Sequence, residues 1–156
     1  MEYLGYRFKI IDKLFKIRMN KRLEKYNITE AQMCVLFYLD HHENEKITQK
    51  VLAQEFSIKH STMSGILQRL EEKGYIEITV DEENKRFKNI RKTELVQSFH
   101  DEMHHHRDET EKILLNGFNE EEKERLRTYL DRIYHNLMEH TDLSEEEMKC
   151  FERREK

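Results

Sequence analysis

The fold is decided between residues 60 and 80, which read HSTMSGILQRLEEKGYIEITV. The first half of this stretch carries apolar side chains at helical spacing, namely Met63, Ile66, Leu67 and Leu70. Such spacing predicts an amphipathic helix that buries one face. Gly74 is suited to the left-handed position that ends a helix. Residues 75–80 alternate in polarity and are enriched in β-branched side chains, which predicts a strand.

The neighbouring residues complete an ordered set of elements. Thr48 is suited to cap a short helix, and a brief polar break around residues 57–59 separates that helix from the next one. After the strand, residues 81–86 predict a polar turn and residues 87–92 predict a returning strand. Helix, turn, helix and hairpin in this order predict a winged helix-turn-helix over residues 28–93.

Helical patterns lie on both sides of this domain. Residues 3–25 carry a broad apolar stripe, and Thr29 with Gln32 forms a capping box for the helix that follows. From Thr93, mostly apolar residues recur at alternating three- and four-residue steps. This spacing predicts a long helix with a seam, that is, a line of side chains along one face against which another helix can pack. Asn119 is suited to cap a last helix.

The composition agrees with a mainly helical chain. Its 156 residues include no proline and four glycines, so little interrupts helices. We predict a mainly α (α+β) fold with a small β-hairpin wing. Residues 28–93 would form the DNA-binding domain, and residues 1–27 together with 94–156 would form a helical dimerisation region.

Charge and cysteine content narrow the class of protein. Residues 1–93 contain 18 lysines and arginines against 14 acidic residues, whereas residues 94–156 contain 10 against 18. A basic first part suits contact with a polyanion although the net charge is −4. Two widely separated cysteines and no long apolar run predict a reduced, cytoplasmic protein without a membrane partner.

The predicted elements place polar side chains where double-stranded DNA would be read. A helix fits the major groove, and a cationic hairpin can reach the neighbouring minor groove or the phosphates. Five of the eight residues 85–92 are cationic. The candidate DNA-binding residues are Thr48, Gln49, Lys50, Lys59, His60, Ser61, Thr62, Ser64, Gly65, Gln68, Arg69, Lys85, Arg86 and Lys88.

The chain resembles the MarR family of regulators over nearly its whole length. The resemblance is carried by Ile28-Thr29 with Gln32, Ile47-Thr48 with Leu52-Ala53, Ser61 to Ser64, Leu70 to Ile76, and Thr93-Glu94. It implies a homodimer that interleaves its first and last helices, binds a pseudo-palindromic operator, and acts as a repressor released by a small-molecule effector. Asn84, where the family usually has an aspartate, and the acidic residues 81–83 depart from the family pattern.

Histidines on the long helix suggest an alternative of the same fold. His100 and His104 stand one helical turn apart and can bind zinc as a pair, with Cys34 as a third candidate ligand. Some MarR-like regulators sense zinc through this helix. Histidine-rich helix surfaces are often simply solvated, so we predict no bound metal or cofactor. His106 lies on the seam and is expected to be packed.

The sequence also bears on two further classes of protein. A winged-helix protein interaction module without DNA binding is favoured by the net acidity and the seam on the long helix. An enzyme is not predicted, because the chain has no glycine-rich phosphate loop, no GxSxG and no HExxH motif.

Overall fold

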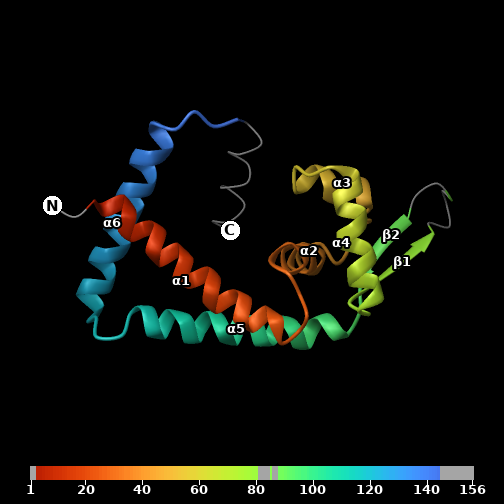
Figure 1. The fold of residues 1–156 in the computed structure, drawn as a ribbon, viewed down its shortest axis with the longest axis horizontal. Coiled ribbons are helices and arrows are strands. Elements are labelled where there is room, and N and C mark those ends of the chain that lie inside the picture. The colour runs from red at the N-terminus through yellow and green to blue at the C-terminus, as the bar shows by residue number, and fades with distance from the viewer. Residues whose placement is uncertain (1–2, 81–84, 86–87, 145–156) are drawn as a thin grey trace. The chain divides into compact units, whose positions relative to one another are not determined.

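The structure is a computed structural model that describes residues 3–80, 85 and 88–144. It confirms the mainly helical fold with one small hairpin (Figure 1). The elements are α1 (Leu4–Glu24), α2 (Glu30–His41), α3 (Gln49–Glu55), α4 (His60–Glu72), β1 (Ile76–Val80), β2 (Lys88–Lys92), α5 (Leu95–Leu114) and α6 (Glu120–Glu139). Among the described helices, none has both the length and the apolar character needed to cross a membrane.

The starts of α2, α3 and α6 are specified locally by capping side chains, as the sequence predicted. At α2, the Gln32 backbone N–H donates to Thr29 Oγ1 at 3.3 Å, and the Thr29 N–H donates to Gln32 Oε1 at 3.0 Å. Thr48 accepts from the Val51 N–H at 3.3 Å in front of α3. These caps satisfy backbone donors that have no partner inside the helix. The same reciprocal box opens α6 at Asn119.

The apolar side of α4 lies in the core of the first compact unit, which comprises residues 1–106. Met63, Leu67 and Leu70 are fully buried, while Ile66 is only partly buried. Gly74 follows the helix with φ of 75°, the left-handed conformation that a C-terminal cap requires. The chain can therefore leave α4 at once and begin β1.

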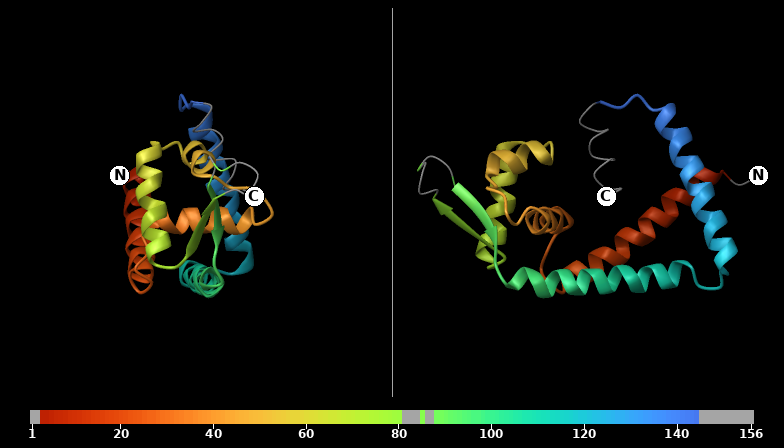
Figure 2. Two further views of the ribbon diagram at one scale, coloured as in Figure 1. Left: turned by 90° about the vertical axis from the view of Figure 1, so that its right-hand side faces the viewer. Right: turned by 180° about the vertical axis from the view of Figure 1, so that it is seen from behind.

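The hairpin is joined to the start of α3 as well as to itself. Strands β1 and β2 pair antiparallel from Ile76 with Lys92 to Val80 with Lys88 (Figure 2). On the other edge of β2, the Ile90 N–H donates to the Ile47 carbonyl at 2.9 Å, and Thr48 forms a bridge with Asn89. The sequence did not predict this pairing, because two residues are too short to be recognised as a strand.

The single chain forms two compact units. The described residues up to His106 belong to one unit and those from Arg107 to the other, so the first part of α5 groups with the first unit. The reason is packing: Phe99 on α5 is fully buried and meets the rings of Tyr26 and Tyr75 edge-on, with centroids 5.3 and 6.0 Å away. The dimerisation role assigned to residues 1–27 and 94–156 stays a prediction.

Candidate nucleic-acid interface

Helix α4 presents a polar face opposite its buried side. Gly65 is partly covered, and a Cβ added there would meet no atom of the described chain within 4 Å, so the backbone is open to close approach. The predicted outward residues that are exposed are His60, Ser61, Thr62, Ser64, Gln68 and Arg69. Hydroxyl, amide and guanidinium groups of this kind can read base edges or hold phosphates.

Several of the predicted contact residues have partners within the protein. Gln49, the first residue of α3, places its Nε2 2.9 Å from the His60 carbonyl oxygen and 2.9 Å from the His60 Nδ1. Gln68 donates to Glu72 Oε1 at 2.9 Å along α4. The first contact joins the starts of two helices, and no local sequence pattern indicated it.

Cations surround the start of α4 and the hairpin. Lys50 and Lys59 are exposed, and Lys59 occupies the N-cap position of α4. Thr48, which caps α3, is partly buried. On the wing, Lys85 and Lys88 are exposed. The predicted contact Arg86 and the family departures at residues 81–84 lie outside the described residues.

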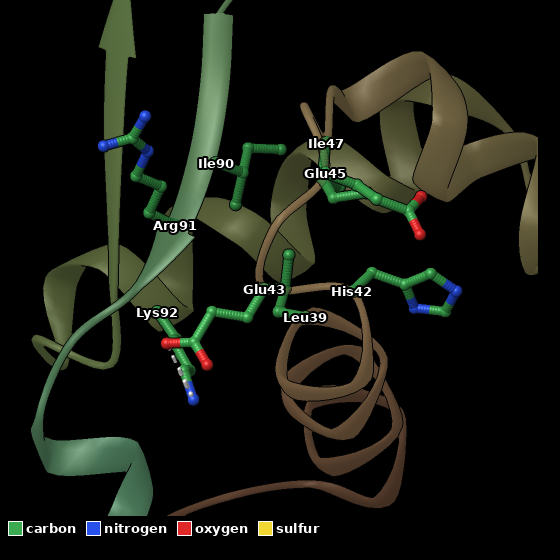
Figure 3. A pocket seen from close by; sticks show the side chains of 8 residues that line it. All are labelled: Leu39, His42, Glu43, Glu45, Ile47, Ile90, Arg91 and Lys92. Atoms are coloured by element: carbon green, nitrogen blue, oxygen red, sulfur yellow. Dashed lines mark ion pairs between the residues drawn. The ribbon is translucent and has the colours of Figure 1, made fainter.

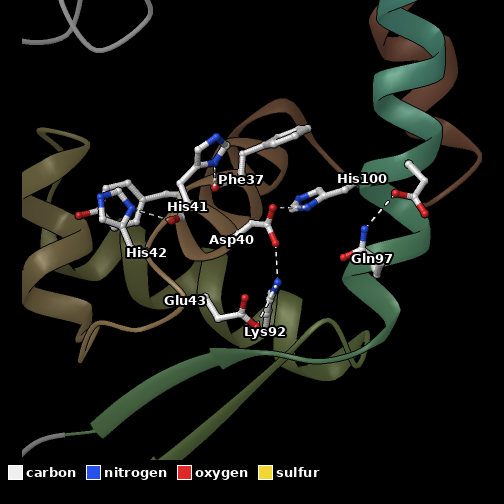
Figure 4. A network of polar contacts seen from close by, with 10 residues as sticks. Phe37, Asp40, His41, His42, Glu43, Lys92, Gln97 and His100 are labelled. Atoms are coloured by element: carbon white, nitrogen blue, oxygen red, sulfur yellow. Dashed lines mark hydrogen bonds and ion pairs between the residues drawn. The ribbon is translucent and has the colours of Figure 1, made fainter. Parts of the chain in front are cut away.

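The base of the wing is fixed by a charged network that the sequence reasoning missed (Figure 4). Lys92, at the end of β2, donates to Asp40 Oδ1 at 2.5 Å and lies 3.4 Å from Glu43 Oε1. The other carboxylate oxygen of Asp40 is 3.1 Å from Nδ1 of the buried His100. Residues of α2, β2 and α5 therefore meet at one carboxylate.

The histidine in this network is held in an apolar setting. The Phe37 ring stacks on His100 with centroids 4.3 Å apart and planes at 12°. The buried Nε2 of His100 has no hydrogen-bond partner in the described part of the chain. Protonating the ring would therefore bury a second donor without an acceptor, which is costly.

These surroundings shift the titration of all three groups. Burial lowers the pKa of His100, with the Asp40 carboxylate opposing that shift and Lys92 and His104 adding to it. Burial favours a raised pKa for Asp40, but the hydrogen bond from Lys92 and the charges of His100 and Lys92 outweigh it and lower the pKa. The bond to Asp40 raises the pKa of Lys92 despite burial.

The candidate zinc ligands of the alternative interpretation are not brought together in the described part of the chain. Within residues 3–80, 85 and 88–144, no three histidine, cysteine or acidic side chains are grouped so that they could hold a metal ion. His100 is turned to Asp40, His104 is exposed, and Cys34 is partly buried on α2. His106 is buried, as its seam position predicted.

A small hollow lies beside the network, between the end of α2 and β2 (Figure 3). Its volume is about 210 Å³, below the 300–1,000 Å³ typical of ligand pockets. Charged side chains contribute much of its lining, together with Leu39, His42, Ile47 and Ile90; the charged residues are Glu43, Glu45, Arg91 and Lys92. Its size and its pairing of Lys92 with Glu43 do not suit an apolar effector.

Comparisons with known proteins agree with this geometry. A model described as the MarR family matches residues 26–86. The Bacillus subtilis protein YybA, described as an uncharacterized HTH-type transcriptional regulator, is 27% identical over 118 residues, covering 76% of this chain and 77% of that protein.

Solved structures match over more of the chain. A MepR–DNA complex from Staphylococcus aureus is 30% identical with a TM-score of 0.75, covering 85% of this chain and 98% of that chain. A structure of MepR described as a regulator of the multidrug efflux pump MepA is 30% identical with a TM-score of 0.77, covering 88% and 99%. A MarR structure is 26% identical with a TM-score of 0.64, covering 88% and 99%.

Because His100 is buried, we expect the folded protein to lose stability on acidification. A group whose pKa is lowered by folding contributes stability that is present above its unfolded pKa, about 6.5 for histidine, and lost as the pH falls toward the folded value. Asp40 acts in the same direction at lower pH. We expect the free energy of unfolding to fall below about pH 6.5, by at most about 1.4 kcal/mol per pH unit from His100.

Urea denaturation as a function of pH measures this effect. The His100→Phe variant keeps a ring against Phe37 without a titrating group, and its stability should depend less on pH. The control is His135→Gln, which removes an exposed histidine on α6 and should follow the wild-type curve. A wild-type slope retained in His100→Phe would contradict the assignment.

Proposed function

The chain belongs to the MarR family of transcriptional regulators, and we propose that it binds a pseudo-palindromic operator as a homodimer through α4 and the wing. The observation that carries the proposal is the division of α4 into two sides. Met63, Leu67 and Leu70 are at most 1% exposed, whereas the opposite side offers hydroxyl, amide and guanidinium groups to solvent. Helices with such an outer face enter the major groove and read base edges.

The wing supplies the second contact in this proposal. Lys85 and Lys88 are exposed on the hairpin, and β2 is held at its far end by the bond from Lys92 to Asp40. A cationic hairpin anchored at its base can place charge on phosphates or in a narrow minor groove beside the helix. That a similar protein, MepR, was crystallised in complex with DNA supports DNA binding by this chain.

Exposed apolar side chains support the homodimer. Along α1 and its N-cap, the exposed large apolar residues are Tyr3, Leu4, Tyr6, Phe8, Ile10, Ile11, Leu14, Phe15 and Ile17. In the second unit, every described residue of α6 keeps part of its surface exposed, including Tyr129, Leu130 and Leu137. Monomeric proteins rarely expose so many apolar groups in one stretch. A second copy of the chain, related by two-fold symmetry, would cover them and duplicate α4.

Repression relieved by a small ligand completes the proposal. A dimer with two α4 helices binds tightly only when their spacing matches successive major grooves. A ligand that binds more tightly to a dimer conformation with a different α4 spacing would increase the population of that conformation and lower the affinity for DNA. The family membership is the support for this step.

The DNA contacts can be separated by their salt and sequence dependence. Replacing both Lys85 and Lys88 by alanine should weaken binding to every duplex and reduce the salt slope by about one unit per lost phosphate contact. Replacing Arg69 by alanine should change the preferred sequence. Binding to a random duplex pool, measured at several salt concentrations, gives both quantities.

A matched control for the wing variant is Lys112→Ala, which removes an exposed lysine from α5. It should leave both affinity and salt slope near the wild-type values. If the wing variant and Lys112→Ala behave alike, or if neither wing nor α4 variants alter binding, α4 and the wing are not the DNA-binding surface.

The homodimer is tested by charge placed on α1. Leu14 is 56% exposed in the single chain, and the Leu14→Glu variant should dissociate because a buried carboxylate in an interface is costly. Sedimentation velocity should show the wild type at about twice the 19.3 kDa chain mass and the variant near that mass. Lys13→Glu, the neighbouring exposed position, should remain dimeric. A monomeric wild type would contradict the proposal.

A further inference from the structure

The contact between Gln49 and His60 joins the first residues of α3 and α4. The Gln49 Nε2 lies 2.9 Å from two acceptor positions of one residue, the His60 carbonyl oxygen and the His60 Nδ1. His60 itself is exposed at the N-terminal end of the helix proposed to enter the major groove. The contact therefore involves a ring that is placed to meet DNA, and the ring nitrogen that carries the hydrogen decides whether His60 donates or accepts there.

The donor and acceptor roles in this contact follow from the carbonyl. A backbone carbonyl only accepts, so the amide group facing it must be the NH₂ and not the oxygen. The same nitrogen faces Nδ1, and two donors cannot share a hydrogen bond. His60 Nδ1 must therefore carry a lone pair, and the neutral ring keeps its only hydrogen on Nε2.

Other histidines of the chain have the opposite arrangement. His41, His42, His135 and His140 each place Nδ1 within 2.7 to 2.8 Å of the carbonyl four residues earlier. A neutral ring in that position donates from Nδ1. His60 is the first residue of its helix and has no helical carbonyl four residues before it, so its ring is free to accept from α3.

We propose that Gln49 is a positioning residue that fixes His60 as an Nε2–H donor to an acceptor atom on a base edge in the major groove. The acceptors available there are guanine N7 and O6, adenine N7 and thymine O4, whereas the cytosine N4 amino group only donates. The inference rests on the proposed function and deepens it. Gln49 then acts on sequence preference through His60, and its amide is occupied within the protein.

The ring state is measured first on the free protein. Long-range ¹H–¹⁵N correlation spectra at a pH well above the ordinary histidine pKa of about 6.5 distinguish the two nitrogens. His60 should show hydrogen on Nε2 alone, and His41 and His135 should show it on Nδ1. A wild-type His60 with hydrogen on Nδ1 overturns the proposal without any variant or DNA.

Substitutions at Gln49 test the cause. Gln49→Glu replaces the donor by an acceptor and should move the His60 hydrogen to Nδ1, while Gln49→Met removes the contact and should give a mixture of both forms. Gln54→Met, at an exposed glutamine of the same helix, is the matched control and should leave the His60 signals unchanged. Identical His60 spectra in the wild type and Gln49→Met also overturn the proposal.

Selection from a random duplex pool tests the consequence. His60→Ala and Gln49→Met should each reduce the preference at the same base pair roughly three- to tenfold, and the double variant should lose no more than either single one. An equal loss across all sequences would place the donor on a phosphate and overturn the base-edge assignment. Absence of DNA binding by the wild type would refute the proposed function, whereas the free-protein spectra would still report the tautomer.

Discussion

The burial of one side of α4 is the constraint on which the rest of the structure depends. Met63, Leu67 and Leu70 have at most 1% of their surface exposed. Burying side chains of this size contributes roughly 1.5–3 kcal/mol each. Because residues three and four positions apart share a helix face, burying these three fixes the rotation of α4 about its axis. Ser61, Ser64 and the other polar residues face solvent as a consequence.

The hairpin is held to the same unit by two contacts that the core alone would not provide. The backbone bond from Ile90 to Ile47 joins β2 to the start of α3, and the salt bridge from Lys92 to Asp40 joins it to α2. His100 brings α5 to the same carboxylate. A substitution at Asp40 therefore removes contacts to β2 and to α5 together. These contacts lie within a single chain and need no partner.

Local patterns predicted the elements well, because each depends on neighbours in the sequence. The caps at Thr29, Thr48 and Asn119 and the buried side of α4 follow from spacing alone. Contacts between distant residues were not predictable. Gln49 meets His60 eleven positions away, and Lys92 meets Asp40 fifty-two positions away. Asp40 follows the apolar run of α2, and this position indicated that its carboxylate would need a polar partner without indicating which one.

The central claim is that two α4 helices enter major grooves of one duplex. Guanine N7 methylation interference on the duplex selected by the protein tests it most directly, because N7 lies in the major groove. We expect two clusters of interfering methyl groups on the same face of the duplex, with centres about one helical turn, or roughly 10 base pairs, apart. Interference in a single cluster, or none at any guanine of a bound duplex that contains guanines on both half-sites, would contradict it.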